Sequence, residues 1–294
     1  SFVCSARDRL DNNPEMIRTI RTERYRYTRN FLPHQPYASF YPDGGFFATA
    51  PEEGTPERTF WETSCLTGGQ KLHDPDGVFL IYGPPVVVKK HGLAEEYRQY
   101  LIWQDQKPFE ELYDTENDLE ETKNLADDPA FSGVKDELRQ KLFTWMIETR
   151  DLGLLDEIEI VARASQYGGV SYKVGCRCDN FERILETADL ARFGEDGKDK
   201  LVVRLNDPDS AVRFWAVTGL FSFEFDPALK ALLEPLLGDP SNSVSLAAAT
   251  YFVRMGEGAQ AIEVFARALR SDILWTRLRA GAYLSYCSKE QLSP

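Results

Sequence analysis

A repeat of 32 residues in the C-terminal part of the chain is the feature that most constrains its fold. Asp207-Pro208 aligns with Asp239-Pro240 at this spacing, and small or apolar positions align with it over three units. These positions are Leu205, Leu237 and Leu269; Ala216, Ala248 and Ala280; and Leu220, Phe252 and Leu284. A short helical unit that cannot bury its apolar face alone does so by stacking on its neighbours. We therefore expect an all-α solenoid over residues 181–294.

The pattern Asp-x-x-x-x-Val-Arg-x-x-Ala at residues 207–216 resembles HEAT repeats. A short solenoid of this kind either packs against its neighbouring domain or offers a surface to a protein or glycan partner. Solenoid surfaces bind by shape, so a repeat pattern does not identify a target. We favour the structural role and keep a protein partner on the repeats as the alternative.

Residues 107–150 predict a strand, a turn and a helix. Glu110–Asp114 has the apolar contacts of a short strand, and Asn117 and Asp118 suit a turn because their side chains can bond nearby backbone groups. A helix is expected from Asp128-Pro129 to Arg150, since proline at a helix start loses no needed donor. Its apolar face has spacings of three and four and consists of Val134, Leu138, Leu142, Trp145 and Met146.

Residues 16–33 predict an antiparallel hairpin, with one strand carrying Arg18 and Arg21, a turn at Thr22-Glu23, and a second strand ending at Asn30-Phe31. We expect its arginines to lie mostly on a solvated face. The fold class is therefore α+β: a small antiparallel sheet with a packed helix, followed by the all-α, HEAT-like solenoid.

Two acidic pairs are expected to cap helices, because Asp and Asn accept backbone N–H bonds at helix starts. Asp127-Asp128 precedes the helix that ends at Arg150. Asp179-Asn180 precedes a helix expected over residues 181–193. We interpret both pairs as caps and not as ligands of a metal ion.

The run Glu-Leu-Tyr-Asp at 111–114, continued by Asp118, Glu121, Asn124-Leu125-Ala126 and Asp128-Pro129, resembles the C-terminal subdomain of sulfatases of the alkaline phosphatase superfamily. The hairpin and residues 6–11 resemble the same family. The resemblance covers residues 1–155 and is weakest in a Gly- and Pro-rich insertion at about 38–106. Residues 156–180 are then expected to be a linker to the repeats.

The resemblance implies a sulfuric ester hydrolase that depends on formylglycine and calcium. Formylglycine is made from Cys or Ser in a Cys/Ser-x-Pro/Ala-x-Arg motif, which none of the five cysteines matches: Cys4, Cys65, Cys176, Cys178 and Cys287. In the family the nucleophile and calcium ligands come from a larger N-terminal domain. We therefore expect no catalytic or metal-binding residue and no cofactor in this chain, which would be a C-terminal fragment, inactive alone.

Arg7, Asp8 and Arg9 are the candidate substrate-binding residues. They resemble a segment that returns from the catalytic domain, where a guanidinium could hold an anionic group through paired N–H donors. The alternative is an ion-pair cluster that fixes the domain junction. The sequence leaves both interpretations open.

Charge and hydropathy limit the partners. A net charge of -13 and a pI near 4.8 argue against a nucleic-acid partner, which needs a basic face. No apolar run is long enough to cross a bilayer. The resemblance implies a missing N-terminal catalytic domain as partner, a sulfated small molecule or glycan as the parent's substrate, and a location compatible with the periplasm or secretion. The alternatives are a non-enzymatic HEAT-repeat scaffold and a phosphodiesterase or phosphatase of the same superfamily.

Overall fold

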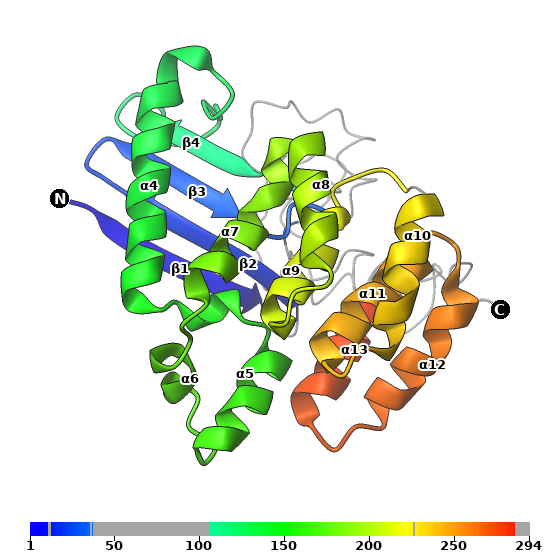
Figure 1. Cartoon of the computed structure of the whole chain (residues 1–294). Helices are drawn as coiled ribbons and strands as arrows, with labels where there is room; N and C mark the ends of the chain where they lie inside the picture. Colours follow the sequence, from blue (N-terminus) through cyan, green and yellow to red (C-terminus); the bar gives the residue numbers. More distant parts are fainter. Residues whose placement is uncertain (11–12, 36, 38–105, 226, 286–294) are drawn as a thin grey trace, which may run out of the picture.

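The computed structural model describes residues 1–10, 13–35, 37, 106–225 and 227–285. A four-stranded antiparallel sheet lies near the N-terminus, and helices joined by turns follow it in the described chain (Figure 1). This arrangement confirms the α+β class. The insertion expected at 38–106 lies outside the described residues, apart from its last residue.

The sheet contains β1 (Val3–Leu10), β2 (Asn13–Arg21), β3 (Tyr25–Asn30) and β4 (Glu110–Asp114), in that spatial order. All neighbouring strands are antiparallel. β2 and β3 form the predicted hairpin, and β4 has the predicted bounds. The edge strand β1 pairs with β2 with one irregularity in register, between Arg7 and Arg9.

One row of the sheet is apolar and forms the core beneath a helix. Ile20 faces Tyr27, which faces Leu112, and all three side chains are fully buried. Helix α4 (Ser132–Thr149) crosses this part of the sheet (Figure 1) and buries Leu138, Leu142 and Met146, as its periodicity predicts. Burying a side chain of this size contributes about 1.5–3 kcal/mol.

A short turn of 3-10 helix, η2 (Pro129–Phe131), leads into α4. The side chain of Asp128 accepts the N–H of Ala130, so the predicted cap at this helix start is confirmed. The helix ends at Thr149, and its C-cap residue Arg150 has a left-handed backbone conformation.

The next row of the same sheet face is charged, because Arg18 pairs in register with Arg29 and Arg29 with Glu110. Each of these residues forms an ion pair with the helical part of the chain: Arg18 with Asp151, Arg29 with Asp189, and Glu110 with Arg139. The expectation that the hairpin arginines are solvated is wrong for Arg18 and Arg29, whose side chains are each 1% exposed. Helices cover that face, and carboxylates replace water around the guanidinium groups.

Helix pairs follow the predicted repeat. The pairs are α8 (Glu195–Arg204) with α9 (Ser210–Leu220), α10 (Pro227–Leu233) with α11 (Asn242–Arg254), and α12 (Gly258–Leu269) with α13 (Leu274–Ser285). A 3-10 turn, η6 (Glu234–Gly238), continues α10. The second helices begin at residues 210, 242 and 274, which is the spacing of 32 seen in the sequence.

The loop inside each pair uses the aligned polar residue in the same way. Asp207, Asp239 and Ser271 each accept, through a side-chain oxygen, the backbone N–H two residues further on. Arg213 and Arg277 each donate Nη1 to the carbonyl six residues earlier. Arg213 also binds the Asp239 carboxylate through Nε and Nη2 at 2.8 and 2.9 Å, which ties one repeat to the next.

Short helices connect the sheet to the repeats. They are η3 (Leu152–Leu154), α5 (Glu157–Ala164), η4 (Ser165–Tyr167), α6 (Tyr172–Cys176), α7 (Phe181–Asp189) and η5 (Leu190–Phe193). The segment expected to be a linker therefore contains α5 and α6, and the domain boundaries stay a prediction. The predicted cap at Asn180 is wrong, because its side chain makes no bond to the start of α7 and instead bonds Asp209.

Gly153 in η3 tests the packing between the sheet and these helices. A Cβ at this position would overlap Arg18 Nη2 and Asp8 Oδ1, so Gly153→Ala is expected to lower the free energy of unfolding by about 2–3 kcal/mol. Gly133→Ala is the matched control, because a Cβ at Gly133 would meet no atom within 4 Å. Urea unfolding followed by circular dichroism measures both. Equal midpoints for the two variants would contradict this packing.

Candidate binding cleft and charged junction

The structure places Arg7, Asp8 and Arg9 on β1 and gives each a charged neighbour. Arg7 Nε lies 2.8 Å from Glu15 Oε2, and Asp8 Oδ1 lies 2.6 Å from Arg18 Nη2. All three side chains are between 41 and 48% exposed, so solvent reaches them. Their role in substrate binding stays a prediction.

Arg9 connects β1 to the last repeat. Its Nη1 lies 3.8 Å from Glu157 Oε1, and its guanidinium carbon lies 4.4 Å from the centre of the Trp275 ring. Glu157 begins α5, and Trp275 belongs to α13. The position of Arg9 therefore depends on both helices.

Arg18 forms the buried centre of this junction. Its Nε and Nη2 bind the Asp151 carboxylate at 2.5 and 3.0 Å, Nη2 also binds Asp8, and Nη1 donates to the Ile17 carbonyl at 2.9 Å. Burial opposes the charge, but the hydrogen bonds and charges of Asp151 and Asp8 outweigh it and raise the pKa of Arg18. These contacts make Arg18 a structural cation.

Acidic residues of α5 meet the starts of helices in the repeats. The Asp156 carboxylate, which is 1% exposed, caps α5 at Ile158, accepts the Ser243 hydroxyl at 3.0 Å and pairs with Arg279 Nη2 at 2.7 Å. Ser243 lies in the first turn of α11, and Arg279 lies in α13. Negative charge is favourable at the start of a helix, where backbone N–H groups are unpaired.

Glu159, one turn further along α5, continues this contact. Its carboxylate accepts the hydroxyls of Ser210, at the start of α9, and Ser241, at the N-cap of α11, the second at 3.1 Å. It also accepts Arg163 Nε at 2.8 Å. We call Asp156, Glu157 and Glu159 the α5 seam, because they join α5 to three successive repeats.

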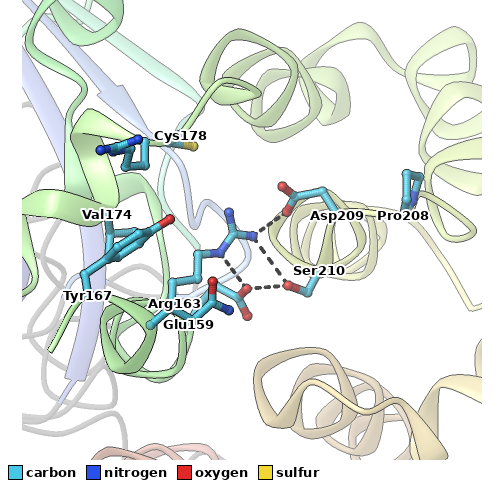
Figure 2. A pocket seen from close by; sticks show the side chains of 10 residues that line it. Glu159, Arg163, Tyr167, Val174, Cys178, Pro208, Asp209 and Ser210 are labelled. Atoms are coloured by element: carbon cyan, nitrogen blue, oxygen red, sulfur yellow. Dashed lines mark hydrogen bonds and ion pairs between the residues drawn. The ribbon is translucent and has the colours of Figure 1, made fainter. Parts of the chain in front are cut away.

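A cleft of about 340 Å³ opens beside the seam. Figure 2 shows Tyr167, Val174 and Cys178 on one side and Asp209 and Ser210 on the other, with Arg163 between them. The lining residues are Glu159, Arg163, Gln166, Tyr167, Val174, Arg177, Cys178, Pro208, Asp209 and Ser210.

Arg163 is held in place by two carboxylates. Its Nε binds Glu159 at 2.8 Å and its Nη2 binds Asp209 at 2.5 Å, as the dashed lines in Figure 2 show. Burial opposes its charge, but the hydrogen bonds to Asp209 and Glu159 outweigh this and raise the pKa of Arg163. Nη1 makes no hydrogen bond to the part of the chain that the structure describes, so its N–H groups are available in the cleft.

Asp209 is saturated by donors. It caps α9 by accepting the N–H of Ala211 at 2.8 Å, and it accepts Arg163 Nη2 and the Asn180 side chain. Burial raises the pKa of Asp209, and the bond and charge of Arg163 with the other donors outweigh it, so the pKa lies below its usual range.

Cys178, in contrast, is a poor nucleophile in the cleft. Burial raises the pKa of its thiol above the usual value, and the nearby cations offset this only in part. A neutral thiol does not attack an ester at neutral pH.

Within the parts of the chain that the structure describes, no three His, Cys, Asp or Glu side chains converge in a way that could hold a metal. Over the same residues, no helix has the length and hydropathy needed to cross a membrane.

Sequence reasoning missed the cleft. The Glu159–Arg163 pair has the i,i+4 spacing of an ion pair on a helix, so the sequence alone could have predicted it. Asp209 lies 46 residues beyond Arg163, and no local pattern predicts that contact.

Comparisons with known proteins find one family and two relatives. The family described as HEAT repeats matches residues 198–285. An ulvan-active sulfatase of Formosa agariphila is 30% identical over 161 residues, which are 55% of this chain and 22% of that protein. A second ulvan-active sulfatase of the same organism is 44% identical over 46 residues, which are 16% of this chain and 9% of that protein. The chain thus matches about a fifth or less of the length of these relatives.

Asp209 gives the cleft a pH-dependent contribution to stability. Because its folded pKa is depressed, ionised Asp209 stabilises the fold above the unfolded pKa of about 3.9, and this contribution is lost as pH falls below it. Asp209→Asn is expected to cost about 1–2 kcal/mol at pH 7 and less near pH 3. Denaturant unfolding of both proteins from pH 7 to 3 measures the difference. The exposed Asp199→Asn is the control; a pH-independent cost at Asp209 would refute the assignment.

Proposed function

We propose that this chain is the C-terminal part of a sulfatase, a sulfuric ester hydrolase whose nucleophile and calcium ligands lie in an N-terminal catalytic domain outside these residues. The observation that carries the proposal is the 30% identity over 161 residues to an ulvan-active sulfatase. That match occupies 22% of the relative, which leaves ample length for a catalytic domain. The strand, turn and helix of residues 110–150 supply a second argument, since their arrangement is the one expected of a sulfatase C-terminal subdomain.

In this proposal the chain supports an active site and does not perform the chemistry. Formylglycine would supply the nucleophile and calcium would hold the sulfate group, both in the catalytic domain. The described residues contain no cluster that could bind that calcium. A sulfated glycan is the proposed substrate class, because both relatives are named for activity on ulvan.

Arg7, Asp8 and Arg9 are the residues through which this chain would reach the substrate. Each is nearly half exposed while its side chain is oriented by an ionic partner. A guanidinium that is held in place loses less conformational freedom when it binds an anion. This combination supports a positioning or binding role at the edge of an active site.

A non-enzymatic scaffold is the second candidate. The match of residues 198–285 to HEAT repeats favours it, since such repeats commonly serve as binding surfaces. The two candidates differ in what precedes Ser1: the enzyme requires a Cys/Ser-x-Pro/Ala-x-Arg motif upstream, and the scaffold does not.

Sulfatase activity tests the main proposal. The chain alone is expected to release no 4-methylumbelliferone from its sulfate ester in the presence of calcium. A longer polypeptide that includes the upstream coding region, produced in cells that generate formylglycine, is expected to be active, and Ala at the Cys or Ser of its motif should abolish turnover. Robust turnover by the chain alone would reveal a nucleophile here. A longer polypeptide with neither motif nor activity would favour the scaffold.

Arg9 tests whether β1 contacts the substrate. In the longer polypeptide, Arg9→Ala is expected to raise KM for a sulfated oligosaccharide about tenfold, the loss of roughly one charge-assisted hydrogen bond. The matched control is Arg21→Ala, an exposed arginine on β2. A lower melting temperature with unchanged KM would show instead that Arg9 only fixes the junction with α13.

A further inference from the structure

The cleft beside α5 has the dimensions of a small-ligand site. Its volume of about 340 Å³ lies at the lower end of the usual range for ligand pockets, about 300–1,000 Å³. The cleft is partly open to solvent, and Tyr167 and Asp209 lie on opposite sides of it (Figure 2). A ligand of monosaccharide or disaccharide size would fill it.

The floor of the cleft presents a donor that is already oriented. Arg163 is fixed by Glu159, whose side chain is 7% exposed, and by Asp209, so its remaining N–H groups on Nη1 keep one direction. Donors held in place before binding cost little entropy when a ligand arrives.

The cleft offers its donors to an anion. The Glu159 carboxylate is occupied by Arg163, Ser210 and Ser241, and Asp209 is occupied by three donors, so both acceptors are satisfied within the protein. Arg177 lies on the lining, is exposed, and forms no ion pair with the described residues. Arg163 Nη1 and Arg177 are therefore the groups left to bind a ligand, and both are cationic donors.

Tyr167 and Gln166 add the contacts that a sugar uses. The aromatic ring of Tyr167 can cover an apolar face of a pyranose while its hydroxyl bonds a sugar oxygen. The Gln166 amide can both donate and accept. An arginine that can approach a carboxylate or sulfate with paired N–H groups completes the set.

We propose that the cleft formed by α5, η4, α6 and the start of α9 binds an acidic sugar unit, one that carries a carboxylate or a sulfate. The choice of a sugar over a peptide rests on the proposed function, because a polysaccharide substrate extends over several units. The net charge of -13 makes the chain as a whole repel such a polyanion, so a local pair of arginines would set where the polysaccharide lies.

Binding to the full chain tests this site without any enzymatic assay. D-glucuronate, D-glucose 6-sulfate and methyl β-D-glucoside are titrated separately and followed by NMR. The two acidic sugars are expected to saturate with millimolar dissociation constants, and the neutral glucoside to bind at least about tenfold more weakly. Comparing D-glucuronate with D-glucose 6-sulfate also shows whether the site prefers a carboxylate or a sulfate.

Two variants place the binding in the cleft. Arg177→Gln is expected to weaken both acidic sugars about tenfold and to leave the neutral glucoside unchanged. Tyr167→Ala is expected to weaken all three sugars. The matched controls are residues that do not line the cleft: Arg270→Gln, an exposed arginine, and Tyr172→Ala, whose residue is 66% exposed. Thermal unfolding of each variant verifies that it folds.

Several outcomes would overturn the inference. They are no saturation by either acidic sugar, equal binding of acidic and neutral sugars, or cleft variants that bind like their controls. Tighter binding of N-acetyl-glutamate amide than of either acidic sugar would assign the cleft to an acidic peptide instead. Because no turnover is measured, sulfatase activity can fail in the longer polypeptide while cleft binding holds, or the reverse, so the two failures are distinguishable.

Discussion

The two halves of this protein are held together by the acidic α5 seam. Asp156 is almost completely buried, and an isolated carboxylate there would be unstable. It is stable because the Ile158 N–H, the Ser243 hydroxyl and Arg279 surround it. A buried ion pair such as Asp156–Arg279 contributes modestly to stability while both partners are present. Removing one partner is costly, because the other charge is then left buried and unpaired. The seam therefore fixes where the repeats lie relative to α5.

The connection continues from α5 to the sheet. Trp215 in α9 donates Nε1 to the Leu154 carbonyl at 2.8 Å, and Asp151 holds Arg18 of β2. Arg9, in turn, touches both Glu157 and Trp275. The position of β1 thus depends on α13, so the repeats help to determine the geometry of this edge of the sheet.

Local rules predicted the elements well, for reasons that the structure makes clear. Alternation of side chains predicted β2 and β3, the spacing of Leu138, Leu142 and Met146 predicted α4, and the repeat predicted where α9, α11 and α13 begin. Arg18 and Asn180 were misjudged because each is controlled by a distant partner. Arg18 bonds Asp151, 133 residues away, and Asn180 bonds Asp209. The cleft also depends on a contact between residues far apart in the sequence, Arg163 and Asp209. A resemblance based on sequence motifs does not predict such a contact.

Helical repeats usually behave as one-dimensional arrays, in which each unit contacts only its neighbours and the end can unravel alone. The seam changes this behaviour, because Glu157 binds Arg279 across 122 residues and Asp156 binds Ser243 across 87. Opening the last repeat would break a buried ion pair at α5 and disturb the Trp275–Arg9 contact with the sheet. The repeats and the sheet are therefore expected to unfold in a single cooperative transition. The chain would fold slowly for a helical protein, because these distant contacts must close before they stabilise it.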